Sequence, residues 1–324
     1  LHELSLPYRI DDLVLHTSPS IGISMFPEDG RDIETLVRNA DTAMYEAKQS
    51  GKGAYRFFTK RQADLPASFN LQASLRDSLA SDSLQLHFQP IVDTHSGRVI
   101  AAEALLRWPT QQGQQISPDI FIPIAEQNGF IVKLGDWVLQ KACEQHRQWL
   151  ELGLPPMHIG INLSAMQFRE ADLIGSLSRG IEENHIDPHY LSVEISDRVF
   201  TGNLQYAVPI LEKLKALGIR ITLDDFGAGY SSLEKLSRLP FDSVKIDRSL
   251  IMSLPDNKVS VAVTAAAISF GQSMDIDVIA EGLESEQVLD FLEEHHCYHA
   301  QGFYLARPMP GEEFAHWYQQ AGLH

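Results

Sequence analysis

The sequence has few cysteines and no long apolar run. Cys143 and Cys297 are the only cysteines among 324 residues, which excludes a disulfide framework and fits a reducing compartment. No apolar run reaches the ~18 residues that a membrane-spanning helix needs, and the first residues, LHELSLPYRIDD, lack a signal-peptide pattern. We therefore expect a cytoplasmic segment with no membrane contact of its own, although a longer parent protein could still be membrane-tethered.

Positive charge is also scarce. Asp and Glu number 43 against 26 Lys and Arg, which gives a formal net charge of −17. A surface of this charge repels polyanions, so duplex nucleic acid is not an expected partner, unless metal ions gather the acids into one site. The hydrophobic share of 44% is enough for a substantial core, and the length suggests one large domain with a fraction of another.

Residues 1–60 predict a small α+β unit. The order is a hairpin, a strand at SIGISMF (20–26), a turn, a helix, and a strand at AYRFF (54–58). Apolar residues at helical spacing predict the helix: Leu36, Ala40, Ala43, Met44 and Ala47. This unit is too small to enclose a core alone. Residues 61–68 (RQADLPAS) are expected to be a linker, which leaves 69–324 as the main domain.

The main domain alternates strand-like and helix-like segments. Eight strands are expected at QLHFQPIV, VIAAEALLRW, HIGINLS, LSVEIS, RITLDDF, SVKID, DVIAEGL and QGFYLA. Eight strands with helical crossovers predict an α/β fold, a TIM-type (β/α)8 barrel. Only six residues separate Val92 from Val99, which is too few for a parallel crossover. The first two strands are therefore expected to form an antiparallel hairpin within an otherwise parallel barrel.

Polar residues recur near one end of seven consecutive strands. They are Glu103, Asn162, Glu194, Asp224, Asp225, Lys245, Asp247, Glu281 and, at the start of the expected eighth strand, Gln301. Any one of these alone is more often a helix cap, a solvated loop residue or a salt-bridge partner. Their recurrence on strand after strand favours an active site at the carboxyl ends of the barrel strands.

The expected metal ligands are all oxygen donors: Glu103, Asn162, Glu194, Asp224, Asp225 and Glu281. A set without His or Cys suits Mg²⁺ or Mn²⁺ rather than Zn²⁺. Five carboxylates exceed the charge of one divalent cation and match two. Two metal ions ~3.5–4 Å apart stabilise both the attacking and the leaving oxygen of a phosphoryl displacement.

Two rival sites are weaker. Paired carboxylates on a barrel also describe glycosidases, but the excess of acids, together with Asn162 and Lys245, argues against that reading. The run HHCYH (295–299) superficially resembles a zinc cluster. It lacks paired ligand spacing on both sides, so a solvated helix end is expected there.

Two resemblances to known families follow from longer motifs. SIGISMFPEDG and LVRNADTAMYEAKQSGKGAYRF resemble the C-terminal half of a GGDEF domain, the diguanylate cyclase fold, without its signature motif. The second set resembles the EAL domain, a family of cyclic di-GMP phosphodiesterases on a barrel with one antiparallel strand. Its motifs are EALLRW (103–108), NLS (162–164), VEIS (193–196), DDFGAGYSSL (224–233), KID (245–247), AEGLE (280–284) and QGFYLARP (301–308).

The second resemblance implies a role for each site residue. Glu103, Asn162, Glu194 and Asp224 would hold a first metal ion; Asp224, Asp225 and Glu281 would hold a second. Lys245 would contact the attacking water and Gln301 would support it. Substrate would meet Gln89, Arg107, Leu105 and Asp247. Asp197 and Glu284 would support the loop after Asp225. The family usually has Glu at the position of Asp197, and the shorter side chain is expected to affect the rate and the metal affinity of the second site, not the fold.

The function expected from this resemblance is hydrolysis of cyclic di-GMP to linear 5′-pGpG, with two Mg²⁺ or Mn²⁺ ions activating water. The chain would then be a cyclic-guanylate-specific phosphodiesterase. The alternative is a non-catalytic cyclic di-GMP receptor that binds and signals. A homodimer through the barrel domain stays open.

Overall fold

The computed structural model describes residues 8–10, 13–15, 20–49, 55–58, 68–110, 115–200, 204–227 and 237–320. The chain divides into two compact units, Leu1–Asp77 and Ser78–His324. The division falls inside helix α2 (Ser68–Ala80). The expected linker lies outside the described residues except for Ser68, which begins α2.

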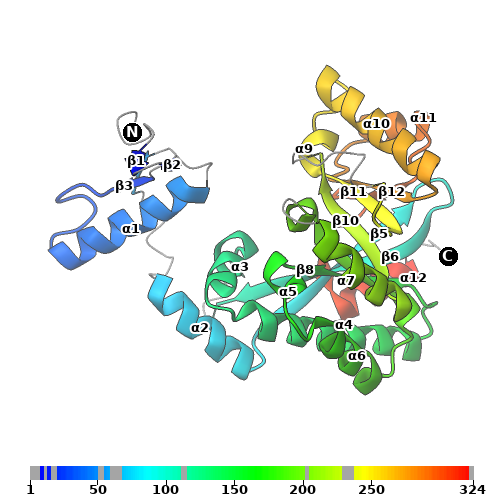
Figure 1. Ribbon diagram of the computed structural model, residues 1–324, viewed down its shortest axis with the longest axis horizontal. Helices are drawn as coiled ribbons and strands as arrows, with labels where there is room; N and C mark the ends of the chain where they lie inside the picture. The colour runs from blue at the N-terminus through cyan, green and yellow to red at the C-terminus, as the bar shows by residue number, and fades with distance from the viewer. Residues whose placement is uncertain are drawn as a thin grey trace. The chain divides into compact units, whose positions relative to one another are not determined.

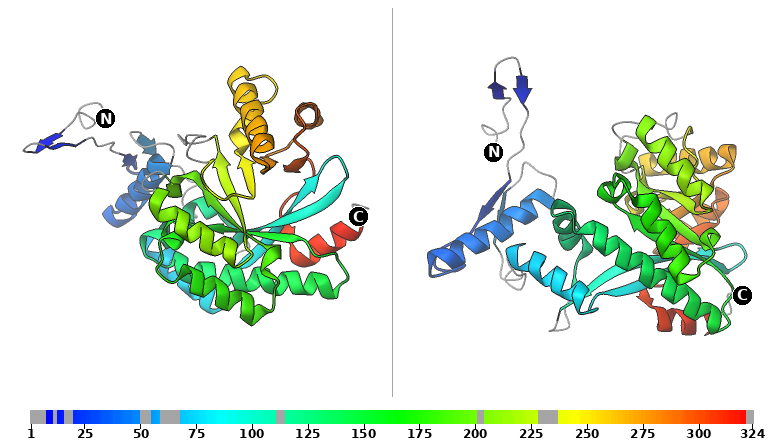
Figure 2. Two further views of the ribbon diagram at one scale, coloured as in Figure 1. Left: turned by 45° about the vertical axis from the view of Figure 1, so that its right-hand side comes forward. Right: turned by 60° about the horizontal axis from the view of Figure 1, so that its bottom comes forward.

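The N-terminal unit has the predicted order of elements (Figure 2). Strands β1 (Tyr8–Ile10) and β2 (Leu13–Leu15) form an antiparallel hairpin. Strands β3 (Ile21–Ile23) and β4 (Tyr55–Phe57) pair in parallel, and α1 (Ile33–Gln49) connects them. The helix packs closely on β3, because a Cβ added at Gly22 would lie 1.8 Å from the Ala40 carbonyl oxygen.

The second unit is a closed barrel of eight strands (Figure 1). In chain order these are β5 (Gln85–Asp93), β6 (Arg98–Pro109), β8 (His158–Leu163), β9 (Leu191–Ser196), β10 (Arg220–Phe226), β11 (Ser243–Ile246), β12 (Asp277–Glu281) and β13 (His299–Gln301). Strand β5 is antiparallel to both of its barrel neighbours, β6 and β13, and the other neighbours are parallel. The predicted TIM-type barrel with one antiparallel strand is therefore confirmed. Two short strands extend the sheet: β7 (Gln115–Ile116) pairs antiparallel with β6, and β14 (Met309–Pro310) pairs antiparallel with β5.

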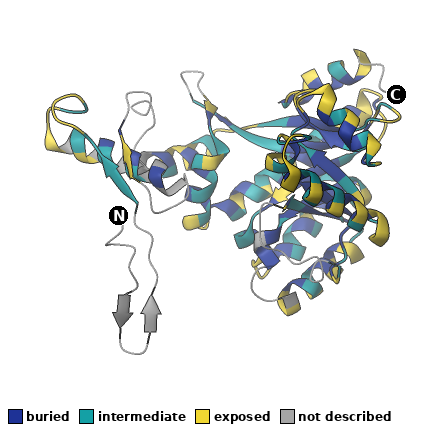
Figure 3. Ribbon diagram, turned by 90° about the horizontal axis from the view of Figure 1, so that it is seen from above, coloured by how far each residue is buried: buried dark blue, intermediate teal, exposed yellow. Residues whose placement is uncertain are grey.

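Helices cover the outside of the barrel. They are α3 (Pro118–Gln127), α4 (Ile131–Glu151), α5 (Ala165–Phe168), α6 (Leu173–Asn184), α7 (Leu204–Ala216), α9 (Arg248–Ile251), α10 (Lys258–Met274), α11 (Glu286–Glu294) and α12 (Gly311–Gln320), with short 3-10 turns η3 (Pro188–Tyr190) and η4 (Asp197–Phe200). Strand residues such as Ile159, Val193 and Ile221 are fully buried, and Figure 3 shows burial concentrated in the strands. Within the described residues, no helix is long and apolar enough to span a membrane.

The eighth strand lies earlier in the chain than the sequence predicted. The predicted segment was QGFYLA (301–306), whereas β13 is His299–Gln301 and the chain then turns. The amides of Leu305 and Ala306 both donate to the Gly302 carbonyl oxygen at 3.1 Å. Gly302 packs against the Leu283 backbone, where a Cβ would come within 2.1 Å of the Leu283 oxygen. This shift puts Gln301 at the end of its strand, level with the other site residues.

The segment HHCYH was expected to be a solvated helix end, which is only partly correct. His295 and His296 follow the end of α11, and His296 is exposed. Cys297, however, is buried, and the chain enters β13 at His299. The segment therefore packs against the barrel instead of extending into solvent.

Candidate active site

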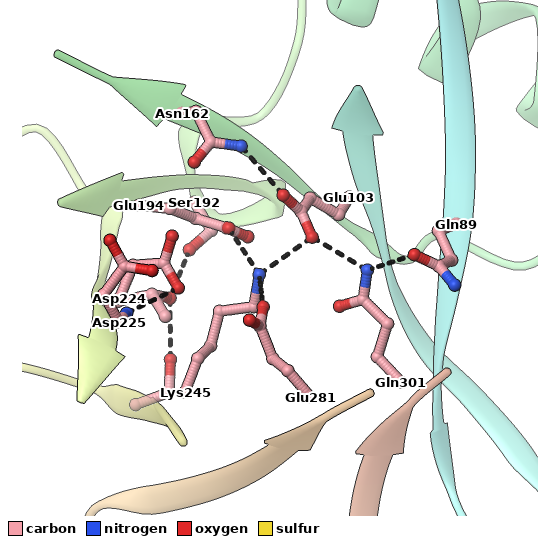
Figure 4. A network of polar contacts seen from close by, with 12 residues as sticks. Gln89, Glu103, Asn162, Ser192, Glu194, Asp224, Asp225, Lys245, Glu281 and Gln301 are labelled. Carbon is pink, nitrogen blue, oxygen red and sulfur yellow. Dashed lines mark hydrogen bonds and ion pairs between the residues drawn. The ribbon is translucent and has the colours of Figure 1, made fainter. Parts of the chain in front are cut away.

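Lys245 lies at the centre of a cluster of carboxylates inside the barrel (Figure 4). Its Nζ is 2.8 Å from Glu103 Oε2, 2.7 Å from Glu194 Oε2 and 2.5 Å from Glu281 Oε1. The lysine side chain is fully buried. A buried ammonium is costly unless charges surround it, and here three strands each deliver one carboxylate. Four of the predicted site residues are therefore brought together.

Amide side chains complete the surroundings of Glu103. Its Oε1 accepts from Asn162 Nδ2 and its Oε2 from Gln301 Nε2, both at 2.8 Å. Gln301 Nε2 also donates to Gln89 Oε1 at 2.9 Å, and Gln89 Nε2 donates to the Ala306 carbonyl oxygen at 3.0 Å. Gln301 Oε1 is buried and finds no hydrogen-bond partner among the described residues. A buried acceptor of this kind favours a donor from water or a bound molecule.

Asp224 and Asp225 occupy a β-bulge. Leu223 pairs with Val244 and Phe226 with Ile246, so β10 carries one residue more than β11 across this step. Asp225 has a φ of 57°, a left-handed conformation that Asp tolerates better than most residues. Its amide donates to Asp224 Oδ1 at 2.8 Å. The bulge breaks the strict alternation of side chains, which explains how two adjacent acids can serve one site.

Strand register explains why side chains so distant in sequence meet. Asn162 lies opposite Glu194, and Glu281 opposite Gln301, in neighbouring parallel strands. Gly160 leaves room for Glu194, because a Cβ at position 160 would lie 2.1 Å from Glu194 Oε1. Sequence reasoning missed this glycine. The available signal was its place two residues before Asn162, since residues two apart in a strand face the same side.

Three acids of the cluster resist ionisation. Burial, together with the Glu103 charge, raises the pKa of Glu194 well above its ordinary value. Burial also raises the pKa of Asp224. For Glu281, burial and the neighbouring Asp224 and Glu103 charges raise the pKa to about 8. One ammonium is too little positive charge for so many buried carboxyls, so the site favours binding of further cations.

Glu103 and Lys245 are shifted toward their charged forms. Burial acts to raise the pKa of Glu103, but the Lys245 charge and the hydrogen bonds from Lys245, Gln301 and Asn162 hold it below its ordinary value. Burial acts to lower the pKa of Lys245, but the surrounding carboxylates raise it well above its ordinary value. The centre of the cluster is therefore an ion pair between a carboxylate and an ammonium.

The donor atoms of this cluster fit a hard divalent cation in their chemistry. All are carboxylate or amide oxygens, the ligands that Mg²⁺ and Mn²⁺ prefer. In the part of the chain that the structure describes, no three acidic, His or Cys side chains form a ready metal cage. Three of the acids converge on Lys245 Nζ instead.

The predicted substrate contacts Arg107, Leu105 and Asp247 make local interactions. Arg107 Nη1 donates to the Leu106 carbonyl oxygen at 3.0 Å, and burial lowers the pKa of this half-buried arginine. Leu105 is half-buried on β6. Asp247 caps the N-terminus of α9 by accepting from the Ser249 amide at 2.9 Å. Their roles toward substrate stay predictions.

The predicted loop supports, Asp197 and Glu284, follow two different barrel strands, β9 and β12. Asp197 is buried directly after β9, where it begins η4. Glu284 is exposed after β12. Most of the loop that follows Asp225, residues 228–236, lies outside the described residues. The bracing role of Asp197 and Glu284 therefore stays a prediction.

The fold and the site define a class: a (β/α)8-type barrel with one reversed strand and a lysine-centred acidic cluster at the carboxyl ends of its strands. The chain belongs to the EAL family, because the model of the "EAL domain" matches residues 72–308. The model of the "Diguanylate cyclase, GGDEF domain" matches residues 1–54. Both resemblances inferred from the motifs are confirmed.

Similar proteins carry related names. The chain is 40% identical over 311 residues to the bifunctional diguanylate cyclase/cyclic di-GMP phosphodiesterase MucR of Pseudomonas aeruginosa, covering 96% of this chain and 45% of that protein. It is 35% identical over 321 residues to the cyclic di-GMP phosphodiesterase PdeR of Escherichia coli, covering 99% and 48%. The chain thus spans less than half the length of either relative.

A solved structure shares the barrel. It is described as "PaMucR Phosphodiesterase, c-di-GMP complex" and matches with a TM-score of 0.73 and 40% sequence identity. The match covers 76% of this chain and 99% of that one. The match therefore takes in nearly the whole of that solved chain and about three quarters of this one.

Proposed function

We propose that the barrel hydrolyses cyclic di-GMP to linear 5′-pGpG. The observation that carries the proposal is the convergence of Glu103, Glu194 and Glu281 on Lys245 at the carboxyl end of an EAL-family barrel. The names of the relatives, and a similar barrel described as a cyclic di-GMP complex, support the choice of substrate.

Two Mg²⁺ or Mn²⁺ ions are part of this proposal. Glu103, Asn162, Glu194 and Asp224 would hold one, and Asp224, Asp225 and Glu281 the other. When bound, such a pair neutralises charge on the attacking and leaving oxygens. The surplus of buried acid over the single ammonium of Lys245 supports this assignment, since it calls for further positive charge.

The chain's own residues would position the reactants. Lys245 is held as an ammonium, so it would act as a hydrogen-bond donor and a positive charge, not as a base. Gln301 Oε1, which has no partner in the described part of the chain, would accept a hydrogen bond from the attacking water. Arg107 would bind a substrate phosphate, as guanidinium groups do.

The proposed reaction forms one bond and breaks one. The water oxygen bonds to phosphorus, and the bond from phosphorus to the ribose 3′-oxygen breaks. The water gives up a proton and the leaving 3′-oxygen gains one. The product is a linear dinucleotide with a 5′-phosphate, 5′-pGpG.

The second candidate is a non-catalytic cyclic di-GMP receptor. One observation favours it: the carboxylates are gathered on Lys245 and do not form a ready metal cage within the described residues. A barrel that stayed in this arrangement would bind the dinucleotide without turning it over.

One experiment separates the two candidates. Purified protein is incubated with cyclic di-GMP and Mg²⁺ or Mn²⁺, the products are separated by chromatography, and binding is measured by calorimetry. We expect 5′-pGpG, its loss in excess EDTA, and its loss in Glu103→Gln. Glu286→Gln, an exposed position on α11, is the matched control and should keep full activity. Binding without product would establish the receptor, and neither binding nor product would overturn both candidates.

A further inference from the structure

Three hydroxyl side chains form a chain of hydrogen bonds beneath the acidic cluster. Thr222 Oγ1 lies 2.9 Å from Ser192 Oγ and 2.7 Å from Ser243 Oγ. All three residues are buried, with exposed fractions of 6% or less. We call Ser192, Thr222 and Ser243 the hydroxyl ladder; Ser192 is labelled in Figure 4.

The ladder joins the strands that carry the site. Ser192, Thr222 and Ser243 each precede a site residue by two positions, on β9, β10 and β11 in turn. Residues two apart in a strand face the same side, so the ladder forms the layer directly below Glu194, Asp224 and Lys245.

The ladder lies next to the register shift between β10 and β11. Strands β10 and β11 pair regularly from Thr222 and Ser243 to the next residue pair, and the bulge at Asp224 and Asp225 then shifts the register. Because the bulge interrupts the backbone hydrogen bonds beside the site, the Thr222–Ser243 hydroxyl contact is a side-chain tie between the two strands immediately before the interruption.

A cavity of about 190 Å³ adjoins the ladder. Its lining includes all three ladder residues, Glu194 and His158. Three hydroxyls carry three hydrogens, and the two bonds within the ladder use two, so one O–H must find an acceptor outside it. His158 Nδ1 is likewise buried without a partner in the described part of the chain. One water needs roughly 10–15 Å³ and two to four polar partners, so the cavity has room and partners for several waters.

We propose that the hydroxyl ladder, completed by water in this cavity, is a positioning device for Glu194, Asp224 and Lys245. Thr222 is its central member, because it makes both bonds. The ladder does not touch substrate. It fixes the strands on which the ligands and the ammonium stand, and its effect on turnover rests on the proposed function.

The test compares two Thr→Val substitutions of nearly equal shape. Thr222→Val removes both ladder bonds. Thr264→Val removes a fully buried hydroxyl on α10 that has no partner among the described residues. We expect Thr222→Val to lower kcat about 10- to 100-fold, since a 1 Å misplacement can cost ~100-fold. It should also raise the Mn²⁺ concentration needed for half-maximal rate and leave KM unchanged. Thr222→Ser should restore kcat, and Thr264→Val should match wild type.

Other outcomes overturn the proposal. A wild-type kcat and metal requirement in Thr222→Val would do so, even if its melting temperature fell, because the ladder would then be merely structural. Ser243→Ala, which removes one bond, replaces Thr222→Val if that variant does not fold.

The ladder and the proposed function can fail separately. If wild type shows no turnover, the proposed function fails, and a crystal structure of metal-free Thr222→Val still decides about the ladder. The ladder predicts that the 2.7 Å separation between Lys245 Nζ and Glu194 Oε2 changes in that variant. An unchanged separation would overturn it.

Discussion

Glu281 Oε1 lies 2.5 Å from Lys245 Nζ, closer than either of the other two carboxylates. Of the three side chains around this ammonium, Glu281 is also the most accessible, at 20% exposure against 8% for Glu103 and 2% for Glu194. It combines the closest approach to Lys245 with a pKa of about 8. Glu281 is therefore one residue through which pH acts on the metal-free site, beside Glu194 and Asp224, whose pKa values are also raised.

Stability of the metal-free protein should fall as pH rises from 6 to 8. The folded-state pKa of Glu281, about 8, is above its ordinary value of 4.5. Between these two pH values the folded protein holds a proton that the unfolded chain releases. The contribution of Glu281 to the free energy of unfolding is therefore fully present below pH 4.5 and is lost as pH rises through 8. Glu103, whose pKa is lowered, acts only at more acidic pH. In excess chelator, melting temperatures should fall more steeply for wild type than for Glu281→Gln. Parallel curves would contradict the assignment.

Gly160→Ala should impair turnover while the barrel stays folded. The new Cβ would lie 2.1 Å from Glu194 Oε1, so the carboxylate has to move, and a shift of about 1 Å can lower the rate ~100-fold. Gly180→Ala on α6 is the control, because its Cβ would meet Leu139 Cδ2 at 2.4 Å and no acid within 4 Å. The control should lower the melting temperature without changing kcat. Equal effects of both variants on kcat would remove Gly160 from the site.

Lys245→Met should destabilise the metal-free protein and nearly abolish turnover. Removing one partner of a buried ion pair leaves its carboxylates uncompensated, which typically costs about 3–5 kcal/mol. Added Mn²⁺ should recover much of the melting temperature, because it replaces the lost positive charge, but it should not recover kcat. Thermal melts with and without Mn²⁺, together with product formation, check this. Recovery of kcat by Mn²⁺ alone would show that the ammonium has no part in the reaction.

Arg107→Ala should weaken substrate binding more than it slows the reaction. A hydrogen bond to a charged group contributes about 1.5–3 kcal/mol, so Kd for cyclic di-GMP should rise roughly 10- to 100-fold. Calorimetry and steady-state kinetics measure the two effects separately. A fall in kcat with unchanged Kd would assign Arg107 a different role.

Asp197→Glu should raise kcat or lower the Mg²⁺ concentration needed for half-maximal activity, with substrate binding nearly unchanged. The longer side chain would reach further toward the loop after Asp225. Asp197 is buried, and an extra methylene in a packed position costs about 1–3 kcal/mol, so the melting temperature should fall. Metal titrations of wild type, Asp197→Glu and Asp197→Ala measure the effect. The same rate and metal requirement in all three would mean that Asp197 braces nothing.

Much of the fold could be predicted because its signals are local. Alternating strand-like and helix-like segments, with only six residues between Val92 and Val99, were enough for a barrel with one reversed strand. The bulge at Asp224 and Asp225 was not predicted, because it exists only in the pairing of β10 with β11. The eighth strand was misplaced because the turn after Gln301 depends on packing against Leu283.

The sequence indicated which acidic side chains would lie near one another, but not that three of them would meet on Lys245. The acids could be recognised one strand at a time. That three of them meet on Lys245 depends on how separate strands align, and a linear pattern does not carry that alignment. The hydroxyl ladder was missed for the same reason, since Ser192, Thr222 and Ser243 look like ordinary strand residues until β9, β10 and β11 lie side by side.

The reversed strand β5 also bears on how the protein is made. The barrel closes only when β13 pairs with β5, and the Gln89–Gln301 hydrogen bond at this seam joins residues 212 positions apart. During synthesis, β5 to β12 emerge before their closing partner and leave strand edges unpaired. Exposed edges promote association between chains. A chain truncated before residue 299 should therefore be prone to aggregation. Chaperone binding to nascent chains should end once β13 has emerged.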